Sequence, residues 1–250
     1  MIPKIIHYCW YGQNEIPEDI KYYIDTWKKY CPDYKIICWN ENNTNLNENK
    51  YLKQAYDAKK YAFVTDYMRL KVLSEYGGIY MDTDIELCKS LDEYLHHRAF
   101  IGCQDENVFS TGLIASEANH PWIAKLFEHY NDLEFINNDG TYNLKPNTIL
   151  ITEITEDLYN WKFKNELQYL NDDICVYPVE YFCCKNWITG KIEKSSETVA
   201  IHHYKGSWLS EEDKRRSKSH LMKKNLIIKL IGKNNLEKAK SLRNKLLNKV

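Results

Sequence analysis

A pair of aspartates at the end of a short apolar segment constrains this chain most. Residues 77–81 read Gly-Gly-Ile-Tyr-Met, which predicts a short buried strand, and Asp82 and Asp84 follow it directly. Two carboxylates two residues apart at the end of a strand can hold one divalent ion. Mn²⁺ and Mg²⁺ prefer oxygen ligands, and phosphate oxygens commonly complete their coordination. The sequence therefore predicts a site for a metal-bound diphosphate.

A helix is predicted over residues 61–76, immediately before this strand. It ends at Gly77, where a left-handed C-cap residue is needed. Asp66 and Arg69 lie three residues apart in this helix, so their side chains share one face. A carboxylate and a guanidinium at this place could hold a ribose and a phosphate. The pair could equally be a salt bridge of little energetic weight, and the sequence leaves both interpretations open.

Strand-like and helix-like segments alternate along the first half of the chain, which predicts an α/β fold with a mostly parallel central sheet. Trp10 ends the first of these strands, at the edge where open α/β sheets bind their ligands. Its indole could stack on a nucleotide base, or it could belong to the core. The predicted strands are 4–10, 35–39, 99–104 and 109–115, and the predicted helices are 18–30, 51–58, 61–76 and 120–130.

Two adjacent histidines, His202 and His203, follow a strand-like segment at 198–201. Neighbouring residues of a strand point to opposite faces, so at most one of them can reach a metal held by Asp82 and Asp84. Alternation from the apolar Val199 and Ile201 selects His203, which we take as the predicted third ligand, although the pattern leaves His202 open. An imidazole suits Mn²⁺ better than Mg²⁺. Alternatively, both histidines cap a turn.

The chain resembles a known family from residue 2 to about residue 210. Its motifs resemble those of the DXD-containing sugar transferases of glycosyltransferase family 32, which occur in capsule and lipopolysaccharide gene clusters. The glucosylating bacterial toxins are more distant relatives. Matching segments, in the order and spacing of the family, are 2–12 (Ile-Pro-Lys-Ile-Ile-His-Tyr-Cys-Trp-Tyr-Gly), 62–70, 76–84 and 202–208 (His-His-Tyr-Lys-Gly-Ser-Trp).

This resemblance implies a GT-A fold, a nucleotide-sugar donor and transfer with retention of the anomeric configuration. It implies that Trp10 stacks on the donor base and that Asp66 and Arg69 contact the ribose, the sugar hydroxyls or the diphosphate. Asp82 and Asp84 would bind metal and donor, and with Arg69 they form the predicted catalytic set. The predicted donor-binding residues are Trp10, Asp66, Arg69, Tyr80, Asp82, Ser207 and Trp208.

The predicted function is that of a glycosyltransferase dependent on Mn²⁺ or Mg²⁺. It would move a hexose or N-acetylhexosamine from a UDP-sugar to a saccharide or lipid-linked oligosaccharide in cell-surface polysaccharide synthesis. A protein-modifying, toxin-like transferase and a non-catalytic sugar-nucleotide-binding protein are the alternatives. A metal-dependent phosphohydrolase would need more carboxylates or histidines for two metals than the sequence offers.

Charge divides the chain into two predicted parts. From 214 to 250, thirteen Lys and Arg stand against one Glu, a net charge of +12, so the overall charge of −1 leaves −13 for residues 1–213. We therefore expect a transferase domain over 1–213 and a basic, amphipathic helical tail over 214–250. The tail could contact an anionic membrane surface, or it could pack on the acidic body or a second subunit. Nucleic acid is a poor partner, because no aromatic residues interrupt the tail.

The cysteines and the start of the chain predict the compartment. Eight cysteines include no C-x-x-C pair, and residues 1–4 enter the first strand without a secretory segment. We expect reduced thiols and a cytoplasmic protein, with peripheral contact at the inner face of the plasma membrane through the tail.

Overall fold

The computed structural model describes residues 1–105, 108–187 and 189–206. Met1–Lys185 and Ile192–Tyr204 form one compact unit, and Asn186–Lys191 groups with Lys205–Val250 in a second. Every site residue described below belongs to the first unit. The predicted boundary between residues 213 and 214, the basic tail, Ser207 and Trp208 all lie outside the described residues.

A seven-stranded sheet forms the centre of the first unit, in the order β2-β1-β3-β6-β5-β8-β7. From the pairing directions, β2, β1, β3, β5 and β8 run one way, and β6 and β7 run the other. The predicted α/β fold with a mostly parallel central sheet is thereby confirmed. The strands are β1 (Ile5–Cys9), β2 (Lys35–Trp39), β3 (Gly78–Met81), β5 (Ala99–Asp105), β6 (Val108–Ser116), β7 (Gln168–Leu170) and β8 (Ile174–Tyr177).

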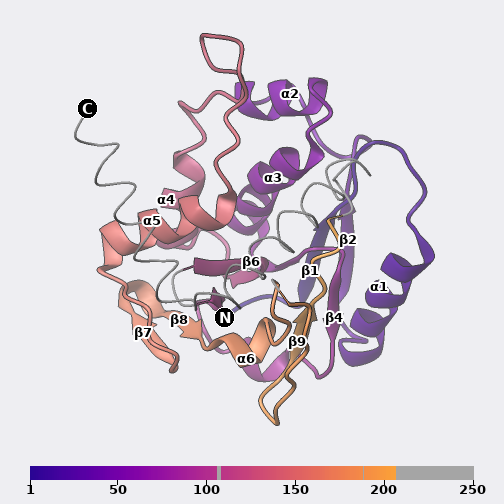
Figure 1. Cartoon of the computed structure of the whole chain (residues 1–250), viewed down its shortest axis with the longest axis vertical. Coiled ribbons are helices and arrows are strands. Elements are labelled where there is room, and N and C mark those ends of the chain that lie inside the picture. Colours follow the sequence, from indigo (N-terminus) through magenta and orange to yellow (C-terminus); the bar gives the residue numbers. More distant parts are fainter. Residues whose placement is uncertain (106–107, 188, 207–250) are drawn as a thin grey trace, which may run out of the picture. The chain divides into compact units, whose positions relative to one another are not determined.

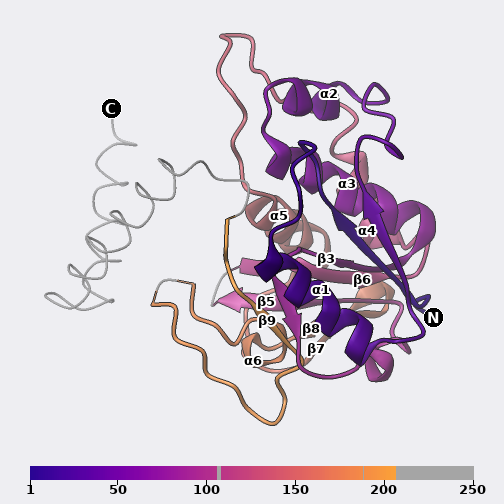
Figure 2. The ribbon, with the colours of Figure 1, turned by 90° about the vertical axis from the view of Figure 1, so that its right-hand side faces the viewer.

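Helices cover both faces of this sheet (Figures 1 and 2). One face packs against α2 (Lys50–Asp57), α3 (Tyr61–Tyr76), α4 (Pro121–Glu128) and α5 (Asn147–Tyr159), and the other against α1 (Glu18–Tyr30) and α6 (Val179–Phe182). Each face of the sheet has its own hydrophobic cluster, and alternate side chains of β3 belong to different clusters. Tyr80 packs on the side of α2–α5, and Ile79 and Met81 pack on the side of α1 and α6. The central strand is thus buried on both faces, as its apolar sequence predicts.

The turn from α3 into β3 depends on Gly77. This residue has φ +64°, and its N–H donates to the carbonyl of Leu73 at 3.0 Å, as expected of a helix C-cap. A Cβ at this position would lie 2.5 Å from the backbone nitrogen of Ala118. Only glycine therefore fits here, and the tight turn delivers the chain directly from the helix into the strand that carries the aspartates.

A second, two-stranded sheet follows the aspartates. It pairs β4 (Ile85–Leu87) antiparallel with β9 (Ala200–His202), and Ile85 lies opposite His202. This pairing brings the histidines, more than 110 residues away in sequence, to the end of β3. Short 3₁₀ turns occur at Asp92–Tyr94 and Asn171–Asp173.

Two further features of the described residues bear on the cysteines and on membrane-spanning helices. All eight cysteines lie in the described part of the chain, and none forms a disulfide. Within that part, we find no helix whose length and hydropathy would suit a bilayer span.

Candidate active site

Asp82, Asp84 and His202 converge where β3 ends. The Nε2 atom of His202 lies 3.3 Å from Oδ1 of Asp84 and 4.0 Å from Oδ2 of Asp82. One ligand atom from each of the three residues lies within 4.8 Å of the others. The backbone N–H of Asp82 donates to the carbonyl of Gly112 at 2.8 Å, which anchors the turn to β6. Three residues from two distant segments thus form one compact group of candidate ligands.

The structure corrects the predicted third ligand, because His202 rather than His203 faces the aspartates. The Nε2 of His203 lies 2.7 Å from Oε2 of Glu86, on the other side of β9. Alternation failed here for a physical reason: Val199, Ala200 and Ile201 are all buried, so both faces of the strand end are covered. Burial therefore could not identify the face that turns toward the metal site.

The two histidines have opposite electrostatic environments. Burial alone would lower the pKa of His202, but the Asp84 carboxylate opposes burial and raises the pKa to about 10. For His203, burial outweighs its hydrogen bond to Glu86, and the pKa is lowered from its usual value. Near neutral pH, and without a metal, His202 is thus a cation paired with Asp84, whereas His203 is neutral.

Arg69 fixes the other side of Asp82. Its Nη2 lies 3.2 Å from Oδ1 of Asp82, and its Nη1 donates to the backbone carbonyl of Thr111. The guanidinium also lies over the ring of Tyr80, 4.7 Å from the centroid, and the Tyr80 hydroxyl donates to the same Asp82 oxygen at 2.9 Å. Two donors therefore hold Oδ1 of Asp82, and its Oδ2 faces His202.

Asp66 completes this network from the preceding turn of α3. Its Oδ1 lies 3.1 Å from the same Arg69 Nη2 that meets Asp82. Burial raises the pKa of Asp66 to about 7, with Arg69 opposing the shift. The arginine side chain is only 5% exposed, so the sequence-based alternative of a weak surface salt bridge does not describe this pair.

Trp10 lies at the same edge of the sheet as the aspartates. β1 and β3 are parallel neighbours with His7 opposite Tyr80, so Trp10 follows β1 as Asp82 follows β3. The indole is partly buried, and its N–H donates to the carbonyl of Asn14 at 2.7 Å. This is the edge at which open α/β sheets bind ligands, and base stacking by Trp10 stays a prediction.

Two β6 residues at the site were missed by the sequence reasoning. Thr111 contributes only a backbone carbonyl, which leaves no side-chain signal. Gly112 had a signal: a lone glycine inside a strand often marks a close approach. A Cβ there would lie 2.9 Å from Cε1 of His202 and 3.3 Å from Oδ2 of Asp82.

The donor set suits a divalent cation. Two carboxylates and one imidazole are ligands that Mn²⁺ accepts readily, whereas Mg²⁺ favours oxygen alone. Asp84 is 8% exposed and the His202 side chain 12%, so both are held in place by their surroundings. The residues present therefore fit the metal that the DXD motif implies.

Comparisons with known proteins find glycosyltransferases. Residues 17–101, about a third of the chain, match the family model described as a glycosyltransferase sugar-binding region containing a DXD motif. The chain is 29% identical over 198 residues to the uncharacterized glycosyltransferase L373 of Acanthamoeba polyphaga mimivirus, covering 71% of this chain and 78% of that protein.

Lipid-modifying enzymes are also among its relatives. The chain is 31% identical over 143 residues to the mannosyl phosphorylinositol ceramide synthase SUR1 of Saccharomyces cerevisiae. That match covers 54% of this chain but only 37% of the yeast protein.

Among solved structures, the glycosyltransferase GlyE of Streptococcus pneumoniae superposes with a TM-score of 0.48 at 9% identity, covering 81% of this chain and 55% of GlyE.

Proposed function

Because this chain belongs to the glycosyltransferases whose sugar-binding region contains a DXD motif, we propose that it transfers a sugar from a nucleoside diphosphate donor with the help of a divalent metal. The observation that carries the proposal is the convergence of Asp82, Asp84 and His202 within 4.8 Å. The finer assignment to glycosyltransferase family 32 stays a prediction.

Each residue of the site has a distinct part in this proposal. Asp82 and Asp84 would hold the ion together with His202, which gives up its proton when it becomes a ligand. Arg69 and Tyr80 keep Asp82 in one orientation before the donor arrives. When bound, the ion would supply Lewis-acid stabilisation of the diphosphate leaving group. No side chain is required as a covalent nucleophile, and we propose transfer with retention.

The donor and acceptor are narrower proposals. UDP-linked hexose or N-acetylhexosamine is the first donor to test, with Trp10 as the platform for the base. The SUR1 name adds mannose and an inositol phosphoceramide acceptor to the test, because a segment of that protein is 31% identical. A lipid-linked acceptor would also be consistent with a basic tail over 214–250 that contacts an anionic membrane. We propose that such an acceptor belongs to cell-surface polysaccharide synthesis.

A donor screen tests the function directly. We expect one of the UDP-, GDP- or CDP-sugars to raise the melting temperature with Mn²⁺ and to lose this effect when EDTA is added. Asp84→Asn should abolish the metal-dependent shift and slow transfer by roughly 10²- to 10³-fold. Asp139→Asn, at an exposed loop position, is the matched control and should behave like the wild type.

The outcomes separate the alternatives. Transfer to a saccharide or glycolipid acceptor supports the proposal, and NMR of the product reports its anomeric configuration. Modification of protein alone favours a toxin-like transferase, and stabilisation by the donor without turnover favours a binding protein. Transfer by Asp84→Asn at the wild-type rate with Mn²⁺ present would disprove the metal site.

A further inference from the structure

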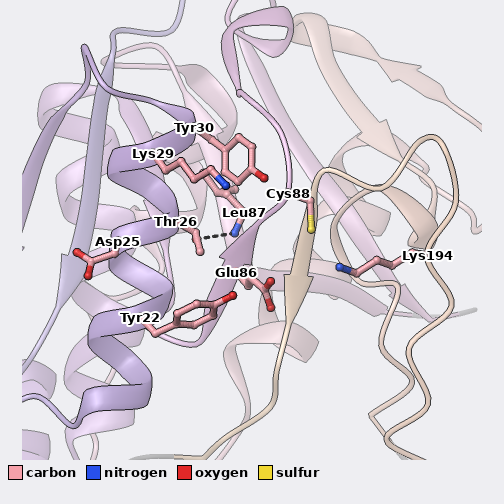
Figure 3. A pocket seen from close by; sticks show the side chains of 9 residues that line it. All are labelled: Tyr22, Asp25, Thr26, Lys29, Tyr30, Glu86, Leu87, Cys88 and Lys194. Carbon is pink, nitrogen blue, oxygen red and sulfur yellow. Dashed lines mark hydrogen bonds between the residues drawn. The ribbon is translucent and has the colours of Figure 1, made fainter.

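A hollow of about 430 Å³ lies between α1, β4 and the segment that leads to β9 (Figure 3). Its volume is within the roughly 300–1,000 Å³ of small-molecule sites. Tyr22 and Lys29 line it from α1, Glu86 and Cys88 from the β4 side, and Lys194 from the opposite segment. None of these residues belongs to the donor site described above.

Tyr22 gives the hollow an exposed but supported aromatic surface. The residue is 57% exposed, so its ring is accessible to a ligand from solvent. Its ring meets the ring of Tyr23 edge-on at 5.6 Å, and Tyr23 stacks on His203 at 4.5 Å. A ring held in this way loses little conformational entropy when a ligand stacks on it.

Basic and acidic side chains both lie around the Tyr22 ring. Figure 3 shows Tyr22 and Glu86 directed toward each other, and Lys194 reaching in from the facing segment. Lys29 lies 5.0 Å from the centroid of the Tyr30 ring, at the upper end of the hollow in that view. A carboxylate opposes the binding of a simple anion, whereas hydroxyl groups can bond to carboxylates, ammonium groups and phenols alike.

The hollow also shares strand β4 with the candidate active site. β4 begins at Ile85, directly after Asp84, and Glu86 forms both a wall of the hollow and the partner of His203. The backbone N–H of His203 donates to the carbonyl of Asp84 at 3.0 Å. A ligand in the hollow would thus lie along the strand that continues from the aspartates.

We propose that this hollow is a second saccharide-binding site, which holds a neutral sugar unit of a glycan by stacking on Tyr22 and by hydrogen bonds to Lys194 and Glu86. The choice of a sugar rests on the proposed function; the site itself rests on the cavity and its side chains. Holding a distant unit of the acceptor would favour long glycans over short ones.

Binding can be tested on the full chain without donor or metal. Saturation-transfer NMR with mannobiose and maltotriose at millimolar concentration should show contact, and Tyr22→Ala should weaken it by about fivefold or more. Lys194→Ala should weaken it as well. Tyr169→Ala is the matched control, because Tyr169 is a 67% exposed tyrosine on β7, outside the hollow.

Several results would overturn the site. These are no signal from either sugar, equal signals from the wild type and Tyr22→Ala, displacement of the sugar by UDP with Mn²⁺, or binding of inorganic phosphate in its place. A melting-temperature shift with UDP and Mn²⁺, measured on the same samples, reports the donor site separately. Sugar binding that persists without that shift would support the second site while the proposed function fails.

Discussion

The two sides of the β9 end hold similar groups in different states. On one side His202 meets Asp84, and on the other His203 meets Glu86. Both pairs consist of an imidazole and a carboxylate within 3.3 Å, yet the pKa of His202 is raised to about 10 and that of His203 is lowered. Composition and distance alone do not distinguish them.

Their surroundings explain the difference. Asp84 has Asp82 nearby, so the His202 side holds two carboxylates for one imidazole and can exchange a proton for a metal cation. On the His203 side, Lys185 donates to the backbone carbonyl of His203, and its charge lowers the pKa further. The His202 cluster is thus suited to binding an ion, whereas the His203 cluster is suited to supporting the wall of the hollow.

Replacing Arg69 should have the largest effect, because this residue supports the His202 cluster through Asp82. Arg69→Met leaves the Asp66 and Asp82 carboxylates without their cation, and we expect a loss of about 3–5 kcal/mol in the free energy of unfolding by urea. Arg98→Met is the control: its ion pair with Glu117 is 42% exposed on the arginine side and should contribute about 1 kcal/mol or less. Equal losses would contradict the buried network.

Replacing each histidine in turn by alanine tests whether His202 and His203 have different roles. His202→Ala should weaken Mn²⁺ binding by roughly 10- to 100-fold, measured by calorimetry, because it removes a candidate ligand. His203→Ala should change Mn²⁺ affinity only a few-fold and should weaken sugar binding in the hollow instead, since Tyr23 loses its stacking partner. The opposite ranking would restore His203 as the ligand that the sequence pattern selected.

The pH dependence of stability, measured on metal-free protein, tests the same difference between His202 and His203. The pKa of His202 is higher in the folded protein, so its contribution is fully present below pH 6.5 and is lost as the pH rises toward 10. The destabilisation caused by His202→Gln should therefore shrink by about 1 kcal/mol or more over that range.

His203 should show the opposite sign. Its pKa is lower in the folded protein, so wild-type stability falls as the pH drops below 6.5, and His203→Gln should reduce this fall. Urea unfolding in EDTA, carried from below pH 6.5 up to pH 10, measures both variants. A His202→Gln effect that does not change with pH would mean that His202 is neutral beside Asp84.

Local chemistry made much of the fold predictable. The bounds expected for the helices at 18–30 and 61–76 and for the strand at 35–39 are those observed. Pro17 marks the start of the first helix, Gly77 marks the end of the second, and a change of hydrophobic period separates the strand from the helix before it. Gly77 marks a turn that only glycine can make. The direction of β6 and the pairing of β4 with β9 depend instead on contacts between distant segments, which no local pattern encodes.

The candidate site also has a part that local sequence predicts and a part that depends on distant segments. Asp66, Arg69, Asp82 and Asp84 were identifiable because they lie in one helix and directly after the strand that follows it. The choice of His202 over His203 depends on which face of β9 turns toward β3, and both faces are buried. Contact of the donor with Trp10, Ser207 and Trp208 stays a prediction.

The smallest effect should come from Gly112, which lies beside both Asp82 and His202. The added Cβ in Gly112→Ala would press on Cε1 of His202 at 2.9 Å and push the imidazole away from its place, while the strand can tolerate alanine. We expect Mn²⁺ affinity to fall a few-fold with little change in urea stability. In a His202→Ala background the same change should have no further effect, because the group it displaces is gone. Additive losses in the double variant would show that Gly112 acts through Asp82 and not through the histidine.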